Sequence, residues 1–347
     1  MAILWCGGED VDLPHGASVS ILTAGSQPSS FRSAFSRCAV YTSTASGGAY
    51  SNAFAGGGVT SCWFSFIAGD YPNTPGGPNS AGMKYAGITH NSLPSAGIYI
   101  GSDSSNYLFP ALYKSSDGMT FTKLASTSTV PISSPGRYDV QIINYGTTGT
   151  IVVYCNGSQI MSYTGDIRVG AAPNLDTVVV RAGTYSFGTG GSATGWKGAS
   201  EIVVADESTL GFQGLATLAP NGNGATQNWS NPAYTNVNPI TINDANSTYT
   251  NTVGQDEQLT MNSLPSGTFQ VKAVKVIARA SATSGATATG LKLGFNNTNN
   301  GTVAEGATHT LGTGFSPVED LFATDPTNGG AHWGANLNGY QLELRSA

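Results

Sequence analysis

Short apolar runs alternate with polar residues along the chain, and turn-forming residues separate one run from the next. Residues 146–166 give the clearest case. There, Asn156-Gly157 lies between the β-branched and aromatic run 151–154 and the alternating run 159–163. Asn-Gly in this position predicts a β-hairpin, since a type I′ turn needs positive φ at both central residues.

The same pattern predicts strands throughout the first two-thirds of the chain. Besides the hairpin strand 151–155, they are expected at 3–6, 37–41, 62–67, 97–101, 120–124, 138–145, 177–181 and 201–205. Proline- and glycine-rich spacers such as 70–79 separate them, and no stretch keeps helical periodicity over three turns. Short strands with regular turns predict an all-β sandwich.

The length of 347 residues predicts two domains. Residues 1–212 hold the strands above and form the first. Residues 213–239 are rich in Asn, Gly and Pro and predict a linker strap, with Trp229 and Tyr234 fixing it to a neighbouring surface. Alternation resumes afterwards, so residues 240–347 predict a second, smaller β-sandwich or jelly roll. Within it, the irregular spacing of valines in FQVKAVKVIARA indicates a strand that is buried on both faces or interrupted by a bulge.

The hairpin sequence VVYCNG resembles the hairpin that recurs in concanavalin-like (laminin-G-like, jelly-roll) β-sandwiches. Two longer segments resemble a family of tailed-bacteriophage virion proteins. The first is SEIVVADESTLG at 200–211, with LATLAP at 215–220 and Asn228-Trp229 after it. The second is FATDPTNGGAHWGANLNG at 322–339. This loop is longer before Trp333 than the family pattern, so its shape is expected to differ.

The resemblance implies a virion structural protein on the particle surface, either a tail-tip or fibre component or a capsid decoration. Its partners would be other virion proteins of the capsid or tail, and its location the virion, assembled in the host cytoplasm. The chain has only 14 basic residues, too few to protect many strand edges from pairing, and this predicts a homo-oligomer. The resemblance favours a trimer with contacts in the C-terminal domain.

The alternative is carbohydrate binding by the first domain during host attachment, with a host-surface glycan as the partner. Tyr107-Leu108-Phe109 and Trp196 are the candidates for stacking on a sugar. Alternating aromatic residues in an all-β fold are also typical of a core and of cross-strand pairs.

No catalytic residue is predicted, and the chain is expected not to be an enzyme. The four histidines, His15, His90, His309 and His332, have no acid or nucleophile at motif spacing. Glycoside hydrolysis needs two carboxylates that flank a sugar. The pairs Asp103/Asp117 and Asp206/Glu207 are present, but neighbouring acids of this kind usually mark solvated turns.

No cofactor or metal is predicted. Glu9, Asp10 and Asp12 form the best candidate for Ca²⁺, although a polar turn after the first strand is the preferred interpretation. The glycine runs 56–58 and 190–191 lack the helix and the Lys-Ser/Thr pair of a phosphate-binding loop.

Charge and cysteine usage exclude further classes. A net charge of −6 without a basic cluster argues against nucleic acid, and no apolar run is long enough to insert in a membrane. The N-terminus lacks the features of a signal peptide, so the matches to the glycosylation sequon at Asn156, Asn228 and Asn246 are attributed to chance. Cys6, Cys38, Cys62 and Cys155 fit neither a zinc nor a redox motif and are expected to be buried thiols, with disulfide pairing left open.

Overall fold

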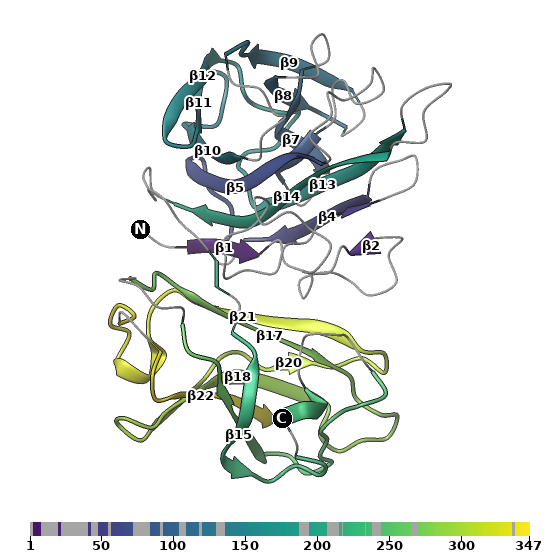
Figure 1. Cartoon of the computed structure of the whole chain (residues 1–347), viewed down its shortest axis with the longest axis vertical. Coiled ribbons are helices and arrows are strands. Elements are labelled where there is room, and N and C mark those ends of the chain that lie inside the picture. The colour runs from purple at the N-terminus through teal and green to yellow at the C-terminus, as the bar shows by residue number, and fades with distance from the viewer. Residues whose placement is uncertain are drawn as a thin grey trace. The chain divides into compact units, whose positions relative to one another are not determined.

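The structure is a computed structural model of the chain (Figure 1). It describes residues 3–7, 20–21, 41–42, 48–54, 57–71, 84–90, 93–103, 109–117, 120–129, 136–186, 194–206, 215–216, 218–232, 234–237, 244–264, 270–334 and 337–347. These residues form strands and two short 3-10 helices. The chain divides into two compact units, and the main boundary falls between Leu215 and Ala216, close to the predicted end of the first domain. Each unit is described by itself.

The first unit contains strands β1 to β14. They are β1 (Ile3–Gly7), β2 (Ser20–Ile21), β3 (Tyr41–Thr42), β4 (Gly48–Ala53), β5 (Cys62–Tyr71), β6 (Lys84–His90), β7 (Leu93–Ser102), β8 (Pro110–Ser115), β9 (Phe121–Ser126), β10 (Gly136–Ile143), β11 (Gly149–Cys155), β12 (Ser158–Gly165), β13 (Thr177–Ser186) and β14 (Thr194–Ala205). Most of them join in the order β12-β11-β10-β5-β14-β13-β6-β7-β8-β9, while β1 pairs with β14 and β4 with β13.

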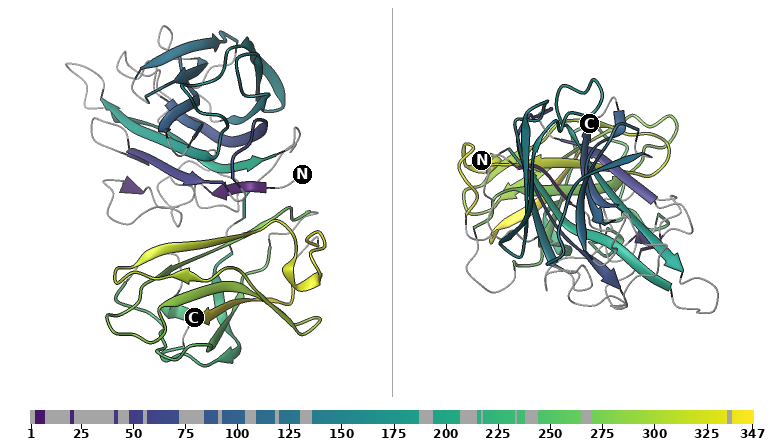
Figure 2. Two further views of the ribbon diagram at one scale, coloured as in Figure 1. Left: turned by 180° about the vertical axis from the view of Figure 1, so that it is seen from behind. Right: turned by 90° about the horizontal axis from the view of Figure 1, so that it is seen from above.

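This long sheet folds over on itself. Its two end strands, β9 and β12, lie against each other. Seen from above in Figure 2, the strands of the first unit fall into two facing groups, which is the arrangement of a β-sandwich. The predicted all-β sandwich is therefore confirmed for this unit.

The alternation of side chains along the strands explains which of them form the core. In β11, every second residue from Gly149 to Cys155 is buried, and Ile151 and Val153 are fully covered. The predicted hairpin follows directly, with Asn156 at φ 49° and Gly157 at φ 81°, the positive values that a type I′ turn requires. The hairpin could be predicted from neighbouring residues alone, because both strands and their turn lie within 17 consecutive residues, 149–165.

The second unit contains β15 (Pro220–Gln227), η4 (Tyr234–Asn236), β16 (Asp256–Met261), β17 (Val274–Ala280), β18 (Gly290–Asn297), β19 (Thr302–Glu305), β20 (His309–Thr310), β21 (Ser316–Phe322), η5 (Pro326–Asn328) and β22 (Tyr340–Ser346). One sheet has the order β15-β16-β22-β18-β19, with β20 also on β18, and a second consists of β17 and β21. Their apolar faces enclose one core, made of Leu259, Val276, Leu291, Leu293, Phe295, Trp333 and Leu344.

The interpretation of residues 213–239 as a linker strap needs correction. Residues 220–227 form β15, an edge strand that pairs with β16. Backbone hydrogen bonds hold an edge strand without an alternating apolar face, so its polar sequence gave no strand signal. Trp229 and Tyr234 do contact an apolar surface, the core of the second unit.

The irregular valine run also has an explanation. Strand β17 begins only at Val274 and pairs with β21 without a register shift, so Val271 precedes the strand. No bulge is needed in this part of the chain.

Candidate functional site

The carboxylates singled out in the sequence have structural partners. Asp103 is buried and its carboxylate lies 3.0 Å from the Lys123 Nζ. The Asp117 carboxylate accepts a hydrogen bond from the Thr120 backbone N–H at 2.7 Å, which closes a turn before β9. Asp206 is exposed just after β14, and Glu207 lies outside the described residues. Asp103 thus forms an ion pair, and the hydrogen bond of Asp117 is that of a turn.

Two histidines have acids that the sequence spacing did not reveal. The Nδ1 of His90 lies 3.0 Å from Asp176 Oδ2, and the Nε2 of His309 lies 3.0 Å from Asp320 Oδ2. In each pair the histidine and the aspartate come from two different segments of the same unit. His332 is exposed, and His15 lies outside the described residues. A His–Asp pair fixes the orientation of the ring, but catalysis would need a third group in reach.

Glu9, Asp10 and Asp12, the acids weighed against a polar turn as calcium ligands, lie outside the described residues. Among the residues that are described, no group of three His, Cys, Asp or Glu side chains could hold a metal ion.

The stacking candidates are only partly visible. Phe109 is half-buried before β8, whereas Tyr107, Leu108 and the side chain of Trp196 lie outside the described part. Glycan binding through these residues stays a prediction. No helix in the described part of the chain is long and apolar enough to cross a membrane.

Cys62 and Cys155 are free, buried thiols and Cys6 is also buried, while Cys38 lies outside the described residues. Burial raises the pKa of the Cys62 thiol to about 12 and also raises that of Cys155. Since the thiolate is the reactive form, neither is suited to act as a nucleophile.

A buried charged cluster lies in the first unit, where the sequence predicted only strands. Arg137 and Asp139 lie on one face of β10, and the Ser65 Oγ donates a hydrogen bond to Asp139 Oδ1 at 2.5 Å. The Nη1 of Arg137 is 3.9 Å from Glu201 Oε2. Glu201 stands at a register shift in β14 and has a φ of 48°, which a glutamate rarely adopts.

The electrostatics of this cluster follow from burial. Burial raises the pKa of Asp139, and the nearby Ser65 hydroxyl and Arg137 guanidinium limit that rise. Burial likewise lowers the pKa of Arg137, whereas the nearby Asp139 and Glu201 carboxylates raise it. The cluster therefore holds opposite charges together inside the unit, which is costly unless the partners stay in place.

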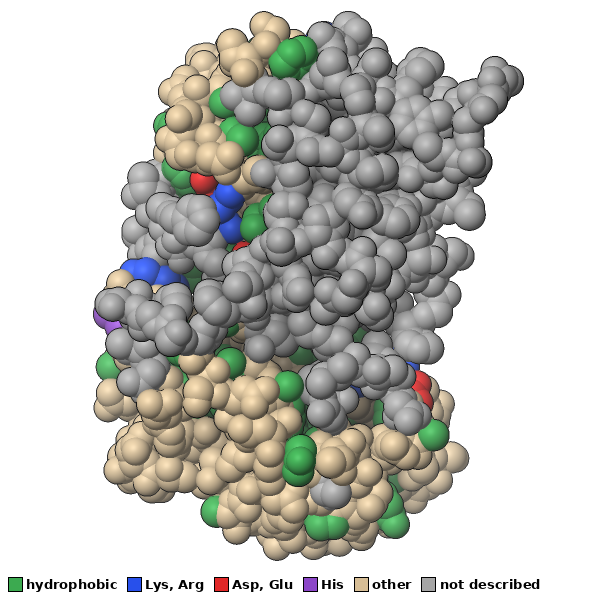
Figure 3. All heavy atoms as spheres, in the orientation of Figure 1, with side chains coloured by type: hydrophobic (Ala, Val, Ile, Leu, Met, Phe, Trp, Pro, Cys, Tyr) green, Lys and Arg blue, Asp and Glu red, His purple; other side chains and the backbone are tan. Residues whose placement is uncertain are grey.

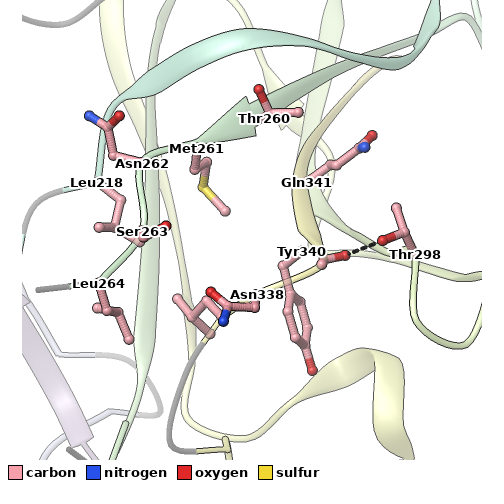
Figure 4. A pocket seen from close by; sticks show the side chains of 12 residues that line it. Leu218, Thr260, Met261, Asn262, Ser263, Leu264, Thr298, Asn338, Tyr340 and Gln341 are labelled. Atoms are coloured by element: carbon pink, nitrogen blue, oxygen red, sulfur yellow. Dashed lines mark hydrogen bonds between the residues drawn. The ribbon is translucent and has the colours of Figure 1, made fainter. Parts of the chain in front are cut away.

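A pocket of about 210 Å³ lies in the second unit, at the end of the sandwich where β16 ends and β22 begins (Figure 4). Its lining comes from four separate segments, namely Leu218, residues 260–264, Thr298 and residues 337–341. None of these residues is an aspartate, glutamate, lysine, arginine or histidine. No pattern in the sequence indicated this pocket, because its walls meet only in the folded unit.

One wall of the pocket is held firmly in place. The Thr298 backbone N–H and its Oγ1 both donate to the Gly339 carbonyl oxygen at 2.8 Å, and Asn299 Nδ2 donates to the Asn338 carbonyl at 2.8 Å. Gly339 has a φ of 83°, and a Cβ there would lie 2.4 Å from the Asn299 Nδ2. The positive φ favours glycine in this turn, and any larger residue would also displace the Asn299 amide.

Comparison with known proteins identifies the fold class only. No family model and no curated protein matches the chain. Among solved structures, an endo-β-1,4-glucuronan lyase from the fungus Trichoderma reesei has 13% identity, covering 48% of this chain and 78% of its own, with a TM-score of 0.32. A SAP-like pentraxin from Limulus polyphemus has 14% identity, 49% and 75% coverage and a TM-score of 0.32. A Bacillus licheniformis β-glucanase has 10% identity, 46% and 71% coverage and a TM-score of 0.30.

These similarities agree with the jelly-roll sandwich class and correct one expectation. The prediction that the chain is not an enzyme is contradicted, because the lyase and the β-glucanase are enzymes with a sandwich of this class. The prediction relied on motif spacing in the sequence, and spacing does not exclude a site that is assembled from distant strands. The acids beside His90 and His309 illustrate this point.

Proposed function

We propose that the chain is a structural protein of a tailed-bacteriophage virion, exposed on the particle surface as a tail-tip or fibre component or a capsid decoration. The proposal starts from the two segments that resemble such proteins. Residues 200–205 belong to β14, which lies between β5 and β13 in the first unit. Residues 218–220 lead into β15 of the second unit, and residues 322–339 join β21 to β22.

The observation that carries the proposal is the role of Asp325 in this last segment. Asp325 is buried and caps η5, since its Oδ1 accepts hydrogen bonds from the Thr327 N–H at 2.9 Å and the Thr327 Oγ1 at 2.8 Å. Its Oδ2 accepts from the Tyr340 hydroxyl at 2.5 Å, and Asn297 Nδ2 donates to Thr327 Oγ1 at 3.1 Å. The Asp-Pro signature thus ties η5 to β18 and β22, so part of the resembling segment has a structural role in the second unit.

The surface of the second unit suits a protein that acts through contacts with other proteins. On the face shown in Figure 3, its described surface consists mainly of neutral polar side chains and backbone, with single hydrophobic residues scattered between them. Charged residues make up only 10% of the chain. Neutral, hydrogen-bonding surfaces of this kind can form many contacts without the desolvation cost of buried charge.

Mass spectrometry of purified particles tests the proposal. Phage particles banded on a density gradient from a lysate of cells carrying the gene are expected to contain peptides from both units. An antibody raised against the recombinant chain should then label intact particles in electron micrographs. Virions that lack the polypeptide, from a lysate that contains it, would show that the chain is not part of the particle.

We also propose that the chain forms a homo-oligomer, a trimer in the particle. Edge strand β15 (Pro220–Gln227) carries no charged residue to prevent pairing with another strand. Light scattering on the purified chain is expected to give three times the chain mass of 35.5 kDa. Replacing Thr226 by lysine would place a charge on this edge and is expected to shift the protein toward monomer. A wild-type monomer at micromolar concentration contradicts self-association in solution.

A further inference from the structure

We propose that Asn328, in the connection between β21 and β22, is a site of spontaneous deamidation. Asparagine is one of the chemically labile side chains of proteins. The backbone nitrogen of the next residue attacks the side-chain carbonyl carbon, ammonia leaves, and a succinimide ring forms. Water then opens the ring at either carbonyl to give aspartate or isoaspartate. This inference does not depend on the virion role, because it rests only on the structure around the asparagine.

Glycine after asparagine favours the reaction, since no side chain hinders the attacking nitrogen. The chain has six such Asn-Gly pairs, which begin at Asn156, Asn221, Asn223, Asn300, Asn328 and Asn338. All six lie within the described residues. The attacking residue is the same in every pair, so the pairs differ mainly in how firmly the fold holds the reacting groups.

Asn328 and Gly329 are the pair whose reacting groups are held least. Asn328 is exposed, and its side-chain amide makes no hydrogen bond within the described part of the chain. The Gly329 N–H, which contains the attacking nitrogen, makes none there either. A Cβ at Gly329 would have no other atom within 4 Å, so this peptide is not crowded.

The backbone around Asn328 is also weakly held. Ring closure needs rotation about the Cα–C bond of Asn328, which is the last residue of η5, the short yellow coil of the second unit in Figure 1. The Asn328 N–H donates to the Asp325 carbonyl at 3.4 Å, and the Ala331 N–H donates to the Asn328 carbonyl at 3.2 Å. Both distances are at or beyond the upper end of the usual range, and 3-10 turns have poor hydrogen-bond geometry. The rotation therefore meets little resistance.

At Asn300 the fold holds both reacting groups. The Asn300 Oδ1 accepts from the Thr302 N–H at 3.0 Å, and its Nδ2 donates to the Thr327 carbonyl at 3.1 Å. The attacking nitrogen, that of Gly301, donates its hydrogen to the Asn297 carbonyl at 2.8 Å. These bonds must break before the ring can close.

Asn221 and Asn223 belong to β15, which pairs with β16. Their side-chain oxygens accept from the Thr260 Oγ1 at 2.8 Å and from the Tyr234 N–H at 2.9 Å. Paired strands and held side chains protect both positions.

The two remaining pairs are held in turns. The Asn156 Oδ1 accepts from the Arg137 N–H at 3.0 Å, and the Asn156 N–H donates to the Arg137 carbonyl at 2.8 Å. The Asn338 carbonyl accepts from Asn299 Nδ2 at 2.8 Å, which fixes the peptide that joins it to Gly339.

Peptide mapping by mass spectrometry, on the full folded chain kept in mildly alkaline buffer, tests the proposal. Asn328 is expected to convert about five times as fast as any other pair, the factor that corresponds to one net hydrogen bond. In the same buffer with enough urea to unfold the chain, this lead is expected to disappear. The proposal is wrong if another pair leads in the folded chain, or if Asn328 leads equally in urea.

Two variants locate the early product. Asn328→Gln would have to close a larger ring, which is slower, so the early product and its isoaspartate should be lost while the other pairs react as before. Asn221→Gln, the same substitution at an exposed position of β15, is the matched control and should leave the early product unchanged. An early product that persists in the Asn328→Gln protein would place the modification elsewhere.

Discussion

Replacing Trp333 by alanine is expected to destabilise the second unit by about 3–5 kcal/mol. The indole is 3% exposed and packs edge-on against Phe295, with ring centroids 5.4 Å apart. Its Nε1 donates a hydrogen bond to the Phe322 carbonyl oxygen at 2.9 Å. The alanine variant leaves a cavity in the core and a buried carbonyl without its donor, so the two costs add.

Urea unfolding of the full chain measures this effect. Trp333→Phe retains most of the apolar contact but not the hydrogen bond, so it should cost clearly less than alanine. Val303→Ala, at an exposed position of β19 in the same unit, should change stability by less than about 0.5 kcal/mol. Equal stability of the alanine variant and the wild type would mean that Trp333 is not part of this core.

Replacing Glu343 by glutamine is expected to stabilise the second unit above pH 7. Glu343 is fully buried on β22, on the polar face of the sheet β15-β16-β22-β18-β19. The Gln258 Nε2 donates a hydrogen bond to its Oε2 at 2.6 Å. Burial, with a smaller effect from the nearby Asp256 and Glu305, raises the pKa of this carboxyl from 4.5 to about 7. A glutamine carbonyl still accepts from Gln258 and never becomes charged.

The direction in which stability changes with pH follows from the raised pKa of Glu343. Below pH 4.5 the carboxyl is protonated in both the folded and the unfolded chain. Between pH 4.5 and about 7 the unfolded chain loses this proton while the folded chain keeps it, so stability falls as pH rises. The loss is complete above about pH 7 and amounts to roughly 3 kcal/mol.

Urea midpoints measured from pH 4 to pH 9 test this expectation. The wild type should lose stability across the window, and Glu343→Gln should remove most of that slope. Glu319→Gln, a partly exposed glutamate of β21 beside Lys275, should leave the slope in place. If the slope persists unchanged in Glu343→Gln, another group is responsible for it.

The sequence predicted those parts of the fold that depend on neighbouring residues. The β11–β12 hairpin follows from the Asn156-Gly157 turn and the alternation on either side of it. Strand β15 was missed because an edge strand is held by its backbone and has no apolar period to reveal it. The alternation of Leu342, Glu343 and Leu344 places Glu343 on the face opposite the core, but it does not reveal that Glu343 is covered.

The candidate sites were harder to predict, since each one is assembled from distant segments. The acid beside His90 comes from the end of the strand-connecting segment before β13, and the pocket combines residues from four segments. No pattern within a short window contains both halves of such a site. What the sequence did contain was the Asp325-Pro326 signature, and this signature proved to be a helix cap within the second unit.

The cysteines give the first unit an experimental signal of its own. All four cysteines precede residue 156, whereas the second unit begins its main segment at Ala216. Cys6, Cys62 and Cys155 are shielded from solvent in the folded chain, and alkylating reagents attack only an accessible thiolate. The rate at which iodoacetamide labels Cys62 and Cys155 therefore reports how often the first unit opens, independently of any unfolding in the second.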